Sequence, residues 1–102
     1  MSLPERVAEG LGYMNVRTLP TGEVAGIMSF MFTWGIIVGI TRYSYRVRYC
    51  YESASEAVPA LLYWDGEGDP PGPWVKAKGK NKEGVSEDRL NPLLGEVVRQ
   101  GE

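Results

Sequence analysis

The chain has 102 residues, of which 43% are hydrophobic and 24% are charged, and its formal net charge is −2 at pH 7. This size and composition predict a single folded domain over residues 1–102, and exclude a chain that is disordered by composition or basic overall. The sequence contains no histidine. An enzyme is therefore weakly supported, because the usual general base and the Ser-His and Cys-His nucleophile pairs are missing, and we expect no catalytic residue, cofactor or transition-metal site.

Cys50 is the single cysteine of the chain. A lone cysteine excludes an intramolecular disulfide, and the N-terminus lacks the pattern of a secretion signal, so a reducing, cytoplasmic setting is expected. No base lies near Cys50 in the sequence, which favours a structural thiol over a reactive one.

The first third of the chain carries modest signals. Residues 1–11 include PERVAEGL, which predicts a short helix with Pro4 in its first turn. Asn15 to Leu19 predicts a short strand, and Pro20-Thr21-Gly22 predicts the turn that closes it. Gly22 to Thr33 stays open between a helix and a buried strand, because its apolar residues fit both periods.

Residues 24–41 carry no charge, and a run of this length requires that a membrane-spanning helix be considered. Gly35 and Gly39 even match the GxxxG pattern of packed membrane helices. A soluble protein is nevertheless favoured, because glycines and hydroxyl residues interrupt the run and Trp34 would lie near the middle of the bilayer. The two glycines then indicate a strand with a close backbone approach or a bulge.

A β-hairpin that leads into a helix is the strongest prediction. The first arm, Ile36 to Ile40, is apolar and rich in β-branched residues, as in a strand covered on both faces. A polar turn follows at 41–44. The second arm then alternates between two faces, with Tyr45, Val47, Tyr49 and Tyr51 on one and Arg46, Arg48 and Cys50 on the other.

The predicted helix runs from Ser53 to Trp64 and begins with a capping-box signature, Ser53 followed by Glu56. Pro59 lacks the amide N–H that a helix interior needs, which predicts a kink or a late start, and Gly66 is expected to stop the helix. The residues on its apolar face, which we expect in the core, are Ala57, Leu61 and Trp64.

The segment from Asp65 to Trp74 holds three prolines and three glycines, which predicts an irregular loop. Its carboxylates alternate like the first half of a calcium loop, but Pro70 and Lys76 stand where such a loop needs glycine and glutamate, so no metal is expected. Trp74 beside rigid prolines predicts either a pinned loop or a recognition surface. The candidate protein-binding residues are Trp74, Pro71 and Pro73.

Beyond this loop, Lys76 to Lys82 is expected to be a solvated loop, and the alternative is a strand on which four lysines form one basic row. Asn91-Pro92 predicts the start of a C-terminal helix. Cations and aromatic residues also interleave on the second hairpin arm, as in sheets that bind nucleic acids, although the acidic net charge argues against this. The candidate nucleic-acid-binding residues are Arg42, Arg46, Arg48, Lys76, Lys78, Lys80 and Lys82.

From FTWGIIVGI through YRVRYCYESASEAVPALLYWDG to DPPGPW, roughly Phe32 to Trp74, the chain resembles small proteins of unknown function from bacterial, phage and prophage genomes. The resemblance implies a bacterial or phage source and a compact soluble protein. It supplies no activity, cofactor or functional residue.

These signals predict a small α+β domain in which a helix packs on one face of an antiparallel sheet of about three strands, built on the hairpin 36–51. The expected function is a non-enzymatic binding or regulatory module that acts through a protein partner. Nucleic-acid binding is the alternative, and an enzyme or a single-span membrane protein through residues 24–41 ranks below both.

Overall fold

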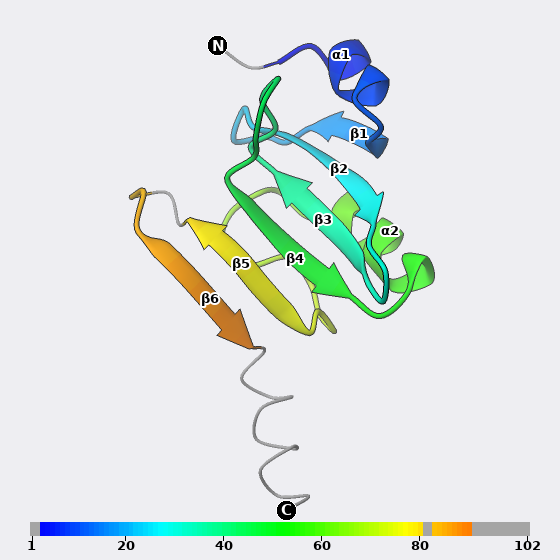
Figure 1. The fold of residues 1–102 in the computed structure, drawn as a ribbon, viewed down its shortest axis with the longest axis vertical. Helices are drawn as coiled ribbons and strands as arrows, with labels where there is room; N and C mark the ends of the chain where they lie inside the picture. Colours follow the sequence, from blue (N-terminus) through cyan, green and yellow to red (C-terminus); the bar gives the residue numbers. More distant parts are fainter. Residues whose placement is uncertain (1–2, 81–82, 91–102) are drawn as a thin grey trace, which may run out of the picture.

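The computed structural model describes residues 3–80 and 83–90 and has an α+β fold, as predicted (Figure 1). Six strands form one antiparallel sheet in the order β1-β2-β3-β4-β5-β6, so the sheet is twice as large as expected and every strand pairs with its neighbour in the chain. The elements are α1 (Glu5–Gly10), β1 (Met14–Thr18), β2 (Val24–Ser29), β3 (Trp34–Val38), β4 (Val47–Tyr51), α2 (Ala54–Leu62), β5 (Lys76–Lys80) and β6 (Ser86–Leu90).

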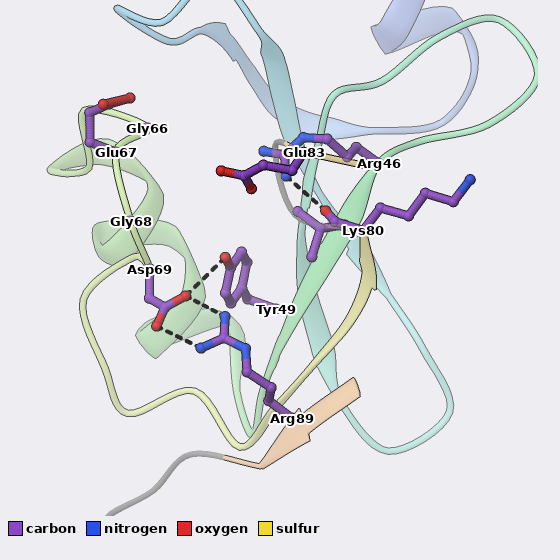
Figure 2. Close-up of a pocket in the computed structure, with 10 residues that line it drawn as sticks. Arg46, Tyr49, Gly66, Glu67, Gly68, Asp69, Lys80, Glu83 and Arg89 are labelled. Carbon is purple, nitrogen blue, oxygen red and sulfur yellow. Dashed lines mark hydrogen bonds and ion pairs between the residues drawn. The ribbon is translucent and has the colours of Figure 1, made fainter. Parts of the chain in front are cut away.

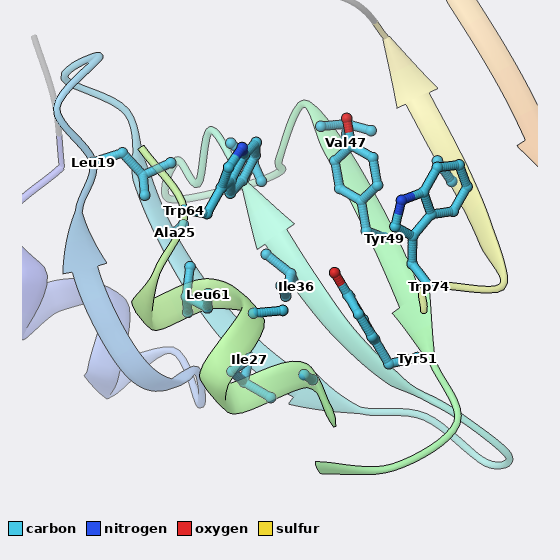
Figure 3. Close-up of a cluster of buried hydrophobic side chains, with 14 residues drawn as sticks. Leu19, Ala25, Ile27, Ile36, Val47, Tyr49, Tyr51, Leu61, Trp64 and Trp74 are labelled. Atoms are coloured by element: carbon cyan, nitrogen blue, oxygen red, sulfur yellow. The ribbon is translucent and has the colours of Figure 1, made fainter. Parts of the chain in front are cut away.

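The two faces of the sheet carry two separate apolar clusters. Helix α2 covers one face, where Leu61 and Trp64 pack over the strands (Figure 3). Helix α1 lies on the other face, where Ala8 packs with Ile37 and Ile40. Strand β3 is buried on both sides as predicted, because alternate residues of one strand point to opposite faces of the sheet.

The predicted hairpin is confirmed as β3 and β4. Ile36 pairs with Tyr49 and Val38 pairs with Val47, which places Val47, Tyr49 and Tyr51 on the face under α2. Tyr45 departs from the prediction, because it precedes the first residue of β4 and packs against the cluster on the other face. The predicted alternation of side chains between the two faces therefore holds within β4 and not at Tyr45, before the strand begins.

The uncharged run 24–41 forms strands β2 and β3, which resolves the ambiguity over residues 22–33 in favour of a strand. Among the described residues, no helix is long and apolar enough to cross a membrane. The two glycines of the GxxxG match are sites of close approach: a Cβ on Gly35 would lie 2.7 Å from Phe30 Cε2, and one on Gly39 would lie 2.8 Å from Arg46 Cβ. Gly35 lies inside β3 and fits the strand interpretation of this motif. Gly39 follows the last residue of β3 and has a φ of +74°, a backbone conformation that favours glycine, so the strand interpretation is wrong for this residue.

Helix α2 follows the predicted segment but differs at both ends. Ser53 is the N-cap, yet its hydroxyl donates to Glu56 Oε1 at 2.8 Å and makes no side-chain bond to the helix backbone. Pro59 lies inside the helix, so of its two predicted effects the late start is wrong and the kink stays a prediction. Its ring is exposed, which keeps the missing N–H on the solvent side.

The helix ends at Leu62, before Gly66 is reached. Its C-terminal end is held by Arg17 of β1, whose guanidinium replaces the glycine cap that we expected. Arg17 Nη1 donates to the carbonyl oxygens of Leu61 at 2.7 Å, Leu62 at 3.0 Å and Trp64 at 3.0 Å. A cation at this end also complements the helix dipole.

The segment after the irregular loop corrects a second prediction. Residues 76–80 form strand β5 and are not a loop, because β4 and β6 on either side supply hydrogen-bond partners for their backbone. Ala77 is buried beside its cross-strand partner Tyr49 on the face under α2, and it is the one apolar side chain of this strand. The residues between α2 and β5 contain no helix or strand, as predicted, whereas Lys82 and the predicted helix at Asn91-Pro92 lie outside the described residues.

Candidate binding surfaces

Four cations share the sheet face opposite α2, and we call this set the basic face: Arg48, Lys76, Lys78 and Lys80. Arg48 of β4 pairs directly with Lys78 of β5, and directly paired residues point to the same side of a sheet. Lys76 and Lys80 flank Lys78 at every second position, so they point the same way. Because residues 76–80 form a strand, the basic row that the sequence offered as an alternative exists for its first three lysines.

Arg48 is the most constrained member of the basic face. Its guanidinium carbon lies 4.9 Å from the centroid of the Phe30 ring, and Nη1 donates to Tyr45 Oη at 3.3 Å. Its Nε is buried and has no hydrogen-bond partner. Among the side chains that the structure describes, no hydrogen bond or ion pair engages the ammonium groups of the three lysines.

The remaining predicted cations do not join this face. Arg46 forms an ion pair with Glu23, with 2.7 Å between Nε and Oε2, and its Nη1 donates to the carbonyl oxygen of Lys80. Arg42 is exposed on the loop between β3 and β4, and Lys82 is outside the described residues.

A polar cleft of about 280 Å³ lies on the other side of the sheet, between β4 and the loop that follows α2 (Figure 2). At its base, Tyr49 Oη donates to Asp69 Oδ1 at 3.1 Å, and Arg89 Nη1 donates to Asp69 Oδ2 at 3.0 Å. Burial, with the carboxylate beside it, raises the pKa of Tyr49 to about 12. The hydrogen bond from Arg89 holds the pKa of Asp69 below its usual range, against the opposite effect of its partial burial. These opposite charges satisfy one another, so the cluster fastens the loop to β4 and β6.

Trp74 is 4% exposed and packs edge-on against Tyr49, with 5.5 Å between the ring centroids. It therefore pins the loop and presents no surface to a partner, which was the other possibility that the sequence left open. Pro71 and Pro73 are exposed, and Pro71 accepts a hydrogen bond of 2.6 Å from Tyr51 Oη. Their part in binding stays a prediction.

The segment that resembled a calcium loop does not gather its carboxylates. Asp65 Oδ1 accepts a hydrogen bond from the backbone N–H of Glu67, and Asp69 turns toward Arg89. In the described part of the chain, no three histidine, cysteine, aspartate or glutamate side chains are grouped so that they could hold a metal ion.

A further surface was missed by sequence reasoning: the turn between β2 and β3. Met31 is 86% exposed and Phe32 is 85% exposed, and we call these two residues the hairpin tip. The residues of this turn, Phe30 to Thr33, include none of the usual turn formers, so the pattern indicated a continuous buried segment. The only available signal was the length of the uncharged run, which is too long for one strand.

No protein-family model, curated protein or solved structure matches the chain. The bacterial or phage origin that the resemblance implies therefore stays a prediction. The case for a function rests on the hairpin tip and the basic face.

Proposed function

We propose that the protein is a non-enzymatic binding module that docks on a protein partner through the hairpin tip. The observation that supports this is the exposure of Met31 and Phe32, two adjacent large apolar side chains of which 86% and 85% are exposed. A cluster of exposed apolar side chains on a soluble protein commonly marks an interaction site. Aromatic anchors of this kind often carry most of the energy of an interface.

The tip is held on a firm base. The backbone N–H of Phe30 donates to the carbonyl oxygen of Thr33 at 2.7 Å, which closes the turn. The Phe30 ring packs into the cluster under α1, with the Arg48 guanidinium over it. A turn fixed in this way loses little conformational entropy on binding, and the flexible thioether of Met31 adapts to the shape of a pocket.

The surroundings of the tip favour a particular chemistry in the partner. Trp34, just after the turn, pairs with Tyr51, so the exposed Glu52 leaves the sheet at the same end as the tip. A pocket with an apolar floor for Phe32 and a basic rim for Glu52 complements this arrangement, in the common pattern of an apolar interface core and a polar rim.

The test is affinity capture from the cells in which the protein is made, with wild-type protein and the variant Met31→Ser/Phe32→Ser as baits. Tyr43→Ser is the matched control, because Tyr43 is 95% exposed and lies on the loop at the opposite end of β3. We expect one or more proteins to be lost from the tip variant and retained by the control. Equal recovery with all three baits would overturn the proposal. Both variants replace exposed side chains, so their stability should stay within about 0.5 kcal/mol of wild type.

A further inference from the structure

We propose that the basic face is a second and separate binding site, which takes the phosphodiester backbone of single-stranded nucleic acid. The site is built on the row Lys76, Lys78 and Lys80 of β5, with Arg48 of β4 beside its centre. It lies on the sheet face that Figure 1 presents to the viewer, with α2 behind the sheet. It shares no residue with the hairpin tip, so the two proposals fail independently.

The geometry of the row suits a linear chain of phosphates. Residues at every second position of a strand are about 6.6 Å apart and lie on one line, so successive ammonium groups meet successive charges of an extended backbone. Arg48 adds a planar group whose N–H donors suit phosphate oxygens, and its stacking on Phe30 fixes the direction in which that group points.

The lysine cations of this face are available to a ligand. No carboxylate among the described residues forms an ion pair with any of the three lysines, unlike Arg46 and Arg89, which are paired with Glu23 and Asp69. The carboxylate whose position opposes the site is Asp88 of β6, which pairs in register with Lys78 and is exposed. Its negative charge lowers the affinity that the four cations would otherwise give.

A single strand fits this face better than a duplex. Duplex DNA presents two backbones, separated by about 6 Å across the minor groove and about 12 Å across the major groove, and a protein that grips both needs a second row of cations. On the β1 side of this face, the described residues are the apolar cluster covered by α1. The site therefore addresses one backbone and reads no base edges, so binding should be independent of sequence.

The experiment uses fluorescence anisotropy with labelled oligo(dT), oligo(U) and a mixed-sequence DNA duplex as probes. With four phosphate contacts, affinity for a single strand should fall about 50-fold as salt rises from about 50 to 200 mM. In Lys76→Gln/Lys78→Gln/Lys80→Gln, one contact remains, and the fall over the same range should shrink to about threefold. Binding of oligo(dT), oligo(U) or both supports the site, and the stronger of the two identifies the nucleic acid.

Three single substitutions separate the position of a charge from the net charge of the protein. Lys78→Gln and Arg6→Gln each remove one positive charge, but Arg6 is exposed on α1, which packs beside β1 and β2, at the other end of the sheet from β5. Lys78→Gln should weaken binding and Arg6→Gln should not. Asp88→Asn should strengthen binding about two- to fivefold, the size expected for removal of one nearby repulsive charge in water. A gain of affinity also shows that the variant is folded.

The proposal is overturned by absence of binding at low salt, by equal weakening in Lys78→Gln and Arg6→Gln, or by an unchanged salt dependence in the triple variant. Tighter binding of the duplex than of either single strand would overturn the choice of ligand.

Discussion

Leu61→Ala tests whether α2 holds the larger of the two apolar clusters together. The Leu61 side chain is 1% exposed and packs among the residues of the sheet face under α2. Replacing leucine by alanine removes three buried carbons. Burial of each carbon contributes about 0.8 kcal/mol to stability, so their removal costs about 2.4 kcal/mol. The cavity left behind adds to this loss, so we expect a decrease of about 3 to 4 kcal/mol in the free energy of unfolding, within the range measured for buried leucines.

The control is the next residue of the same helix. Leu62 is 60% exposed, so Leu62→Ala should lower the free energy of unfolding by at most about 1 kcal/mol, although helix propensity changes equally in both variants. Urea denaturation of the three proteins measures the difference. In thermal melts, the melting temperature should fall by about 4 to 8 °C for each kcal/mol of stability lost in a domain of this size. Equal effects at the two positions would refute the placement of the helix on the sheet.

Two further predictions concern the polar contacts that hold the connection between β4 and β5. Arg17→Met removes the guanidinium that caps three carbonyl oxygens at the end of α2, and should lower stability to urea by about 1 to 3 kcal/mol; a loss below about 0.5 kcal/mol would show that water caps the helix equally well. The pKa of Asp69 is lower in the folded state than in the unfolded chain, so the unfolded chain takes up the proton first as the solution is acidified. The stability that Asp69 contributes is therefore present above about pH 4 and is lost as the pH falls toward its folded-state pKa. As the pH is lowered through this range, the urea midpoint of unfolding should fall more steeply for wild type than for Asp69→Asn. Parallel curves of urea midpoint against pH would contradict the role of the Arg89 contact.

The hairpin and the face of α2 were predictable from the sequence because their apolar residues repeat with the period of the backbone. Tyr49 and Tyr51 alternate with Arg48, Cys50 and Glu52, and Leu61 falls one helical turn after Ala57. Such a pattern states which side of an element is buried, and the structure buries those sides.

Strand β5 escaped prediction because its buried side is almost without side chains. Between its lysines lie only Ala77 and Gly79, and Gly79 meets the backbone of β4: a Cβ there would be 2.6 Å from Val47 Cα. Close contact between the backbones of β4 and β5 therefore holds this strand in place, and the amino-acid composition of the segment does not reveal such a contact. The basic row exists only if this segment is a strand. Because a loop was the preferred prediction, the row remained the alternative.

The exposed and buried aromatic residues were also difficult to distinguish from the sequence. Trp74 is buried, with Tyr49 packed edge-on against it and the Arg89 guanidinium over its ring, and both contacts come from distant parts of the chain. Phe32 is exposed because the chain turns at a point that has no turn-forming residue. Both outcomes depend on tertiary structure, which local periodicity does not encode.

The strand order has a consequence for how the chain folds. All five pairings join strands that follow one another in the sequence, and α2 with its loop, residues 52–75, makes the long connection, between β4 and β5. Local pairings of this kind form quickly, whereas closing a long connection is entropically slower. Synthesis proceeds from the N-terminus, so β1 to β4 have the opportunity to assemble while β5 is still in the ribosome. The basic face would then be completed last, when β5 and β6 dock against β4.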